Sequence, residues 1–302
     1  MKKSKFSNRI KAGVITKGWW LLSLLPLAWL QALAVPIGSL VWRFVQRERN
    51  IAKVNLALCF PDMPLAERDA LGKQSIIEIT RTMLEMGRMW MAPKDKVLAD
   101  FVSLQGIEAV EEANKNKQPI ILLGPHIGQW ELIAQLMSHK TNFTFMYSEP
   151  KLAELDATIR KGRCRMGGNL VPANIKGVAG LLKALKRGEM VGILPDQVPD
   201  KGQGGELVLF YGQAALTATL LPKLVQKTGA KVFTALAKRL PKGKGFELIL
   251  IPADEQVYSD DEVTAVAGVN ASVEQIIAYA PEQYQWAYKR FKNTPGKDVY
   301  KK

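Results

Sequence analysis

The chain has 302 residues, of which 47% are hydrophobic, and a formal net charge of +14 at pH 7. This length provides one substantial domain with a large core. The two cysteines, Cys59 and Cys164, are too few for a disulfide framework and fit a reducing compartment.

The positive charge lies at the two ends of the chain. Residues 1–53 contain ten Lys or Arg against Glu48, and residues 286–302 contain six against Asp298. These segments carry +9 and +5, which is the whole excess, so the middle of the chain is near neutral. Basic ends beside an apolar segment favour an anionic membrane surface as the partner. Because the basic tracts contain no recognisable base-reading motif, we predict no nucleic-acid partner.

The apolar segment runs from Trp19 to Trp42 and contains no formal charge over 24 residues. That length is sufficient to cross the hydrocarbon core of a bilayer, and tryptophan is common at its two interfaces. Pro26, Pro36 and Gly38 predict a kinked or re-entrant helix. We therefore predict an N-terminal apolar membrane-anchoring helix within a basic-flanked anchor over residues 1–53.

A cleaved secretory signal is the alternative for this segment, because small residues at 32–34 resemble a cleavage site. The apolar pattern continues past that point, which favours the anchor. Basic residues flank the segment on both sides, so the positive-inside rule does not decide whether it spans the membrane or lies in it.

Residues 54–302 are predicted to form one domain. A helical pattern over 65–91 begins after Pro64 and ends before Pro93. Beyond it, apolar strands alternate with helical patterns. The predicted strands cover 120–123, 143–147, 190–194, 206–210, 231–237 and 246–251, and the predicted helices start at 130, cover 156–163, 177–186 and 216–227, and start again near 260. This alternation predicts an α/β fold with a mixed, largely parallel central sheet flanked by helices.

The most informative residues are His126 and Glu131, which follow the apolar run at 120–123. His126 lies in the turn between that strand and the helix starting at Trp130. Ligands of open α/β sheets bind at the carboxyl ends of strands, so the position is suggestive. A neutral imidazole can take a proton from a hydroxyl, and it works best when a carboxylate holds one ring nitrogen. We expect Glu131 to hold His126, and Gly128 to let backbone N–H groups approach an oxyanion.

The alternative for this pair is structural, with His126 capping the helix and Glu131 complementing its positive end. A metal site would need further ligands, and no second His or Cys lies near enough in the sequence to complete one. We therefore predict no metal and no cofactor.

Two further stretches are candidates for the same site. Asp196 and Gln197 follow the apolar strand at 190–194, so their strand end and that of His126 are expected to converge on one crevice. Arg160 and Arg163, with Arg165, form a cationic cluster that would hold phosphate groups bidentately or, alternatively, form a solvated helix end. No GxSxG elbow is present and neither cysteine neighbours a histidine, so a covalent intermediate has no obvious nucleophile.

Over nearly its full length the chain resembles the lipid A late acyltransferases of Gram-negative bacteria, the lauroyl and myristoyl transferases within the lysophospholipid acyltransferase superfamily. The resemblance rests on the His-x4-Glu block at 126–131 and on the motifs NLALCFPD (55–62), LPDQ (194–197), TGAKVF (228–233) and PEQYQWAYKRFK (281–292), with the region around Gly162 and Arg163. The last motif is similar to the family's PEQYxWxHRRFK. Two departures are Tyr288-Lys289 in place of His-Arg, and Ser148 in place of an arginine.

The resemblance implies transfer of a fatty acyl chain from acyl carrier protein to the hydroxyl of a hydroxyacyl chain on a lipid A precursor. It implies His126 as general base and Glu131 as the group that orients it. Arg163 and Arg160 would bind anionic groups of the substrate, and Asp196 and Gln197 would shape the second wall. Since the donor is cytoplasmic, the catalytic domain is expected to face the cytoplasm from the inner membrane, among inner-membrane lipids.

Two alternatives remain at this stage. One is an acyltransferase that acts on a glycerophospholipid or another glycolipid. The other is a non-enzymatic, membrane lipid-binding protein on a degenerate acyltransferase fold. Acyl chain length, acceptor position, the number of chains transferred and the oligomeric state are not encoded in any motif of the sequence.

Overall fold

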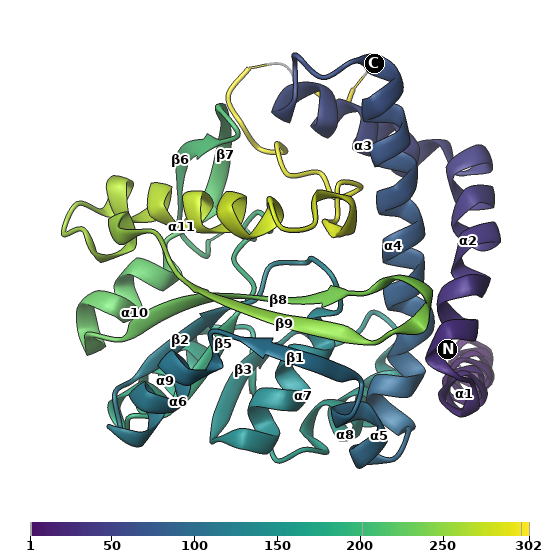
Figure 1. The fold of residues 1–302 in the computed structure, drawn as a ribbon, viewed down its shortest axis with the longest axis horizontal. Helices are drawn as coiled ribbons and strands as arrows, with labels where there is room; N and C mark the ends of the chain where they lie inside the picture. The colour runs from purple at the N-terminus through teal and green to yellow at the C-terminus, as the bar shows by residue number, and fades with distance from the viewer. Residues whose placement is uncertain (1, 201, 297, 302) are drawn as a thin grey trace.

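A seven-stranded sheet forms the centre of the computed structural model, which describes residues 2–200, 202–296 and 298–301. Its strand order is β1-β9-β8-β2-β5-β3-β4 (Figure 1). Strands β8, β2, β5, β3 and β4 run parallel to one another. Strand β9 is antiparallel to β8, and β1 pairs with β9 in parallel. The bounds are β1 Phe101–Gln105, β2 Ile120–Leu123, β3 Phe143–Tyr147, β4 Asn169–Pro172, β5 Met190–Ile193, β8 Lys231–Arg239 and β9 Phe246–Pro252. The prediction of a mixed, largely parallel sheet is confirmed.

Helices cover both faces of this sheet, and therefore all residues of β2 and β5 are buried. Continuous apolar strands are typical of such a two-sided arrangement. On one face, Leu122 and Phe233 join a core with Leu132 and Leu136. The helices that contribute to this face are α4 Leu65–Met91, α6 Ile107–Lys115, α7 Trp130–Lys140 and α8 Asp156–Cys164, with the short α5 Lys94–Leu98 beside them.

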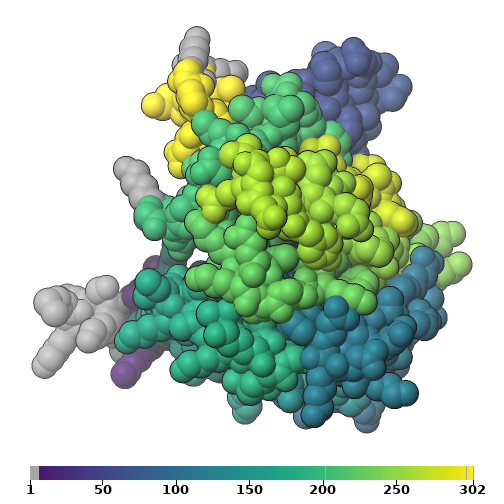
Figure 2. Space-filling view, turned by 90° about the vertical axis from the view of Figure 1, so that its left-hand side faces the viewer, coloured from purple at the N-terminus to yellow at the C-terminus, as the bar shows by residue number. Residues whose placement is uncertain are grey.

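The opposite face is covered by α9 Ile175–Lys186, α10 Leu220–Thr228 and α11 Glu262–Ile277, which pack on Ile121 and Val191. A third cluster joins α11 to α3 Gln46–Cys59 around the buried Trp286. Figure 2 shows this side, with α11 in yellow-green across the middle and the C-terminal end in yellow at the upper left. A separate antiparallel hairpin, β6 Gly205–Phe210 and β7 Gln213–Ala218, packs against α11.

The N-terminal segment forms two helices, α1 Lys2–Leu24 and α2 Leu27–Phe44, broken at Pro26 as the proline predicted. Both pack along the outer side of α4 (Figure 1). Among the described residues, α2 is the one helix long and apolar enough to cross a membrane, and 28% of it is buried. Large apolar side chains on these helices face outward, including Leu21, Leu24, Trp29, Leu33, Leu40 and Phe44. The division of the chain at residue 53 stays a prediction.

The predicted helix over 65–91 and the predicted strands over 120–123 and 143–147 are confirmed to the residue. The predicted helix over 216–227 is wrong at its start, because residues up to 218 continue β7 and the helix begins at Leu220. Ala215 and Thr217 alternate with less buried neighbours, which is the pattern of a strand paired with β6. Strand β6 itself lies outside the central sheet.

The unpredicted helices and strands are α3, α5, α6, β1, β4 and β7. Strands β1 and β4 form the two edges of the central sheet, and neither contains a fully buried residue. Edge strands therefore lack the continuous apolar run that made β2 and β5 recognisable.

Candidate active site

The candidate site lies where β2 and β5 end side by side. Leu123 pairs with Ile193 at the last position of the two strands, and the backbone N–H of Gly124 donates to the Ile193 carbonyl over 2.9 Å. His126 and Asp196 each follow three residues beyond these strand ends. The predicted convergence of the two strand ends is confirmed.

Asp196 holds both the ring and the backbone of His126. The two atoms Asp196 Oδ1 and His126 Nδ1 lie 2.9 Å apart, and the backbone N–H of His126 donates to Asp196 Oδ2 over 2.9 Å. The Asp196 side chain is 3% exposed and that of His126 is 15% exposed. The ring also contacts Trp130 edge-on, with centroids 5.0 Å apart. These contacts fix the ring from the Nδ1 side, so that Nε2 is the ring nitrogen not held by Asp196.

The Asp196 carboxylate stays ionised despite its burial. Burial by itself raises the pKa of Asp196, but the charge of His126 and the hydrogen bonds from its ring and backbone outweigh that effect and lower the pKa. An ionised Asp196 accepts the Nδ1 proton, so the lone pair is on Nε2. The side-chain nitrogen of Gln197 lies 3.3 Å from that Nε2 atom and marks where a hydrogen-bond donor reaches it.

The expectation that Glu131 holds His126 is wrong, because Asp196 occupies that position. Glu131 instead accepts hydrogen bonds from Trp90 Nε1 over 3.1 Å and from Arg163 Nε over 3.0 Å, and a second bond from Arg163 Nη2. Its place in the first turn of α7 directs its carboxylate to α4 and α8, which supply these two donors. Asp196 is 70 residues from His126 in sequence, and only the pairing of β2 with β5 brings it near.

Arg163 is paired with Glu131, and its side chain is 23% exposed. Burial lowers the pKa of Arg163, but the Glu131 charge and hydrogen bond outweigh it, so the pKa is raised. Its guanidinium also stacks on the Tyr147 ring at 5.3 Å, and that of Arg160 approaches the same ring at 5.4 Å. Arg160 is exposed, whereas Arg165 donates to backbone carbonyls at the end of α4. Of the three predicted cations, Arg160 is thus the one presented to solvent.

The C-terminal segment (residues 281–292) binds both loops of the site. The backbone N–H of Gln285 donates to the His126 carbonyl over 3.1 Å, and the N–H of Gly128 donates to the Gln283 carbonyl over 3.2 Å. The hydroxyl of Tyr288 accepts a hydrogen bond from the N–H of Val198 over 3.0 Å. Tyr288, which departs from the family motif, therefore supports the loop that carries Asp196.

Gly128 is required by the path of the chain between His126 and Glu131. Its φ is +59°, in the left-handed region, and an added Cβ would lie 2.2 Å from the Ala237 carbonyl oxygen. The next residue, Gln129, donates its N–H to the same carbonyl over 3.0 Å. The loop is thus anchored to β8 at a point where a side chain has no room.

The family model described as bacterial lipid A biosynthesis acyltransferase matches residues 3–293. The chain belongs to this family. It is 31% identical over 276 residues to the lipid A biosynthesis lauroyltransferase of Escherichia coli (strain K12), covering 91% of this chain and 89% of that one. The lipid A biosynthesis palmitoleoyltransferase of the same organism is 29% identical, with the same coverage, and its lipid A biosynthesis myristoyltransferase is 28% identical, covering 87% of this chain and 84% of that one.

The protein is therefore an acyltransferase of lipid A biosynthesis, and the resemblance read from its motifs is confirmed. The degenerate, non-enzymatic alternative is set aside by the same match.

Because Gly128 lies so close to the Ala237 carbonyl, we predict that a methyl group at this position lowers stability more than one at an open glycine. Gly128→Ala should destabilise the protein by roughly 3 kcal/mol or more, because strain at positive φ adds to the clash with Ala237. Gly212→Ala is the matched control, since Gly212 has a φ of +74° and nothing lies within 4 Å of its Cβ position. It should cost about 1 kcal/mol from strain alone. Thermal unfolding in detergent measures the loss of stability in both variants. An equal loss in Gly128→Ala and Gly212→Ala would contradict the clash with Ala237.

We predict that replacement of Asp196 lowers the stability of the protein in a pH-dependent way. Asp196→Asn should cost about 1–3 kcal/mol at neutral pH, because charge-assisted hydrogen bonds to His126 are lost. Since the folded-state pKa of Asp196 is lowered, its contribution is complete above the ordinary carboxyl pKa of about 4 and is lost as pH falls through the folded value. The free energy of unfolding of wild type and variant is measured from pH 8 to pH 3. The difference between the two proteins should stay constant from pH 8 to about pH 4 and become smaller at lower pH. A difference that disappeared between pH 8 and pH 6 would contradict this assignment.

Proposed function

We propose that the protein transfers a fatty acyl chain from the thioester of acyl carrier protein to a hydroxyacyl hydroxyl of a lipid A precursor. The observation that carries the proposal is the His126–Asp196 pair at the joined ends of β2 and β5, in a chain of this family. A carboxylate on Nδ1 and a free Nε2 are the arrangement that a general base of this type needs.

The chemistry follows from Nε2 of His126, where an acceptor hydroxyl would replace the Gln197 amide as the hydrogen-bond donor. An acceptor hydroxyl placed near Gln197 gives its proton to Nε2 of His126, and its oxygen forms a bond to the thioester carbonyl carbon. The carbonyl electrons move to oxygen, and their return breaks the carbon–sulfur bond. The imidazolium then gives the proton to the departing thiolate. The products are an ester and a free thiol, and His126 returns to its neutral form.

Direct transfer agrees with the state of the two cysteines. Burial raises the pKa of the Cys59 thiol to about 12, and burial also raises the pKa of Cys164. The thiolate is the nucleophilic form, so neither residue is activated at neutral pH. We therefore infer that the acyl chain passes directly from the thioester to the acceptor, without a covalent acyl-enzyme.

Glu131 has a different role from that of an orienting carboxylate. With Trp90 and Arg163 it joins the first turn of α7 to α4 and α8, and thereby supports the helix that follows the His126 loop. The exposed Arg160, at the Tyr147 ring beside Arg163, would attract the anionic groups of the acceptor.

We propose that α1 and α2 hold the enzyme at the cytoplasmic side of the inner membrane. The outward apolar side chains of these helices and the hydropathy of α2 support contact with lipid. The basic residues near both ends of the chain would attract anionic lipid and the acidic acyl carrier protein. Residues 1–53 would then form the anchor and residues 54–302 the catalytic domain.

Removal of the proposed base tests the mechanism. His126→Ala should lower kcat by roughly 100-fold or more, within the range of general-base contributions. It should also lower the melting temperature, because the buried Asp196 loses its ring partner, so activity is measured at a temperature at which the variant is folded. The measurement is acyl transfer from acyl carrier protein to a lipid A precursor by purified protein in detergent. Full activity of the variant would exclude His126 as the base.

Lipid analysis of a strain without the protein tests the acceptor. Mass spectrometry of its lipid A should show the loss of one or more secondary acyl chains, and the mass lost identifies the chain. Unchanged lipid A with altered glycerophospholipids would instead support the alternative acceptor.

A further inference from the structure

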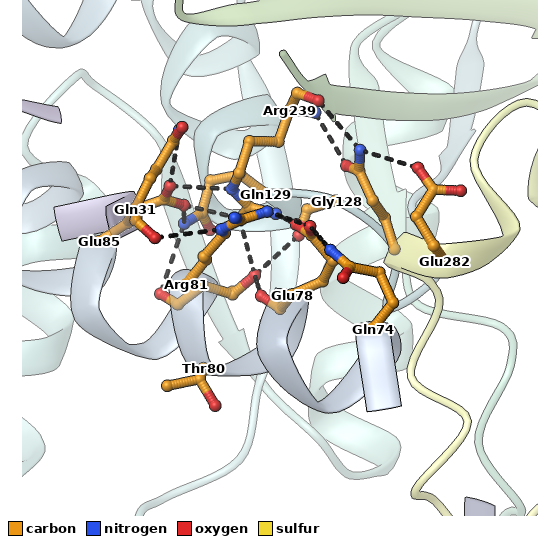
Figure 3. A network of polar contacts seen from close by, with 12 residues as sticks. Gln31, Gln74, Glu78, Thr80, Arg81, Glu85, Gly128, Gln129, Arg239 and Glu282 are labelled. Carbon is orange, nitrogen blue, oxygen red and sulfur yellow. Dashed lines mark hydrogen bonds and ion pairs between the residues drawn. The ribbon is translucent and has the colours of Figure 1, made fainter. Parts of the chain in front are cut away.

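A buried ionic network lies between α4 and the end of β8 (Figure 3). The guanidinium of Arg239 donates to Glu78 over 2.7 Å and to both oxygens of Glu85 over 2.8 Å and 2.6 Å. The three side chains are 1%, 4% and 0% exposed. Burial lowers the pKa of Arg239, but the two carboxylates outweigh this and raise it, so the arginine stays charged.

The network reaches the loop that carries His126 through two contacts. The Thr82 hydroxyl donates to the Gly128 carbonyl over 3.0 Å and accepts from Arg239 over 2.9 Å. The side-chain amide of Gln129 donates to Glu85 over 2.8 Å. Gly128 and Gln129 are the second and third residues after His126, so α4 holds the loop immediately after this residue.

Stability alone does not account for charges at this position. Ion pairs buried in a protein lose most of their attraction to desolvation, and apolar side chains of equal volume often serve as well. An apolar contact has no preferred direction, whereas the hydrogen bond to the Gly128 carbonyl sets the orientation of that peptide group, and the bond to Glu85 fixes the Gln129 side chain. The network is therefore suited to fixing the loop geometry.

The same network is joined to the apolar helix α2. Gln31 of α2 is buried, donates to Glu85 over 3.2 Å, and accepts from the backbone N–H of Gly243 over 3.0 Å. Arg81 of α4 donates to the Gln31 carbonyl over 3.3 Å. One polar residue within the apolar segment thus ties the proposed anchor to the support of the His126 loop.

We infer that the Glu78–Arg239–Glu85 network is a positioning device for the catalytic base, and that Thr82 transmits it to the Gly128 peptide. This rests on the proposed role of His126. Thr82 touches no reacting atom; it acts by holding the turn in which His126 presents Nε2. Loss of its hydroxyl should therefore change the chemical step and leave substrate binding intact.

Thr82→Val and Thr82→Ser form the test pair, because serine keeps the hydroxyl and valine keeps the shape. Thr82→Val should lower kcat about tenfold, with KM within about twofold, since small misplacement of a catalytic group is costly. Thr82→Ser should keep kcat within about threefold of the wild type. The assay is acyl transfer by full-length protein in detergent, with thermal unfolding measured on the same samples.

Asp100→Asn is the matched control for lost stability. Asp100 forms a bidentate ion pair with Arg88, which lies in α4 as Thr82 does. The two bonds measure 2.7 Å and 2.8 Å, and the side chains of Asp100 and Arg88 are 10% and 12% exposed. This pair is not among the contacts of the His126 loop. Asp100→Asn should lower the melting temperature and leave kcat unchanged.

Equal kcat for Thr82→Val and wild type, or an equal loss in Asp100→Asn, would overturn the inference. His126→Ala measured in parallel separates the two proposals. If His126→Ala is inactive while Thr82→Val is fully active, the positioning role fails and the base survives. If His126→Ala is active, the proposed mechanism fails, and the positioning role fails with it.

Discussion

The hydrogen bond between Asp196 and the Nδ1 atom of His126 is the interaction on which the proposed chemistry depends. It exists because β2 and β5 are neighbours in the sheet and end at the same level. The carboxylate is buried, yet its partner keeps it ionised, so one residue both fixes the ring and selects its tautomer. A surface carboxylate would do this less well, because water would compete for both hydrogen bonds.

Two kinds of interaction stabilise the interior of this protein, namely apolar packing and buried ion pairs. Apolar side chains hold the sheet and its helices together, and they make no distinction between small rotations of a peptide group. Around the His126 loop the interior is polar: Arg239 with Glu78 and Glu85 on one side, and Glu131 with Arg163 on another. These directional bonds surround the loop that carries the proposed proton-accepting nitrogen.

The helices proposed to meet the membrane are part of this support. Helices α1 and α2 pack on α4, and α4 contributes Thr82 and Glu85 to the His126 loop and Trp90 to Glu131. The proposed anchor and the candidate site therefore both contact α4. An acyltransferase whose substrates are lipids gains from this arrangement, because its site is held at a constant position relative to the anchor.

The sequence by itself determined the α/β class, helix α4, the buried strands β2 and β5, and the position of His126 at a strand end, because apolar periodicity and strand-end position are local signals. It also placed Asp196 and Gln197 at a second strand end. The tertiary structure decided which carboxylate serves which partner. Glu131 is near His126 in sequence but binds Arg163, whereas Asp196 is distant in sequence and binds the ring. Such pairings depend on strand order and helix packing, which bring together residues whose separation along the chain carries no sign of contact.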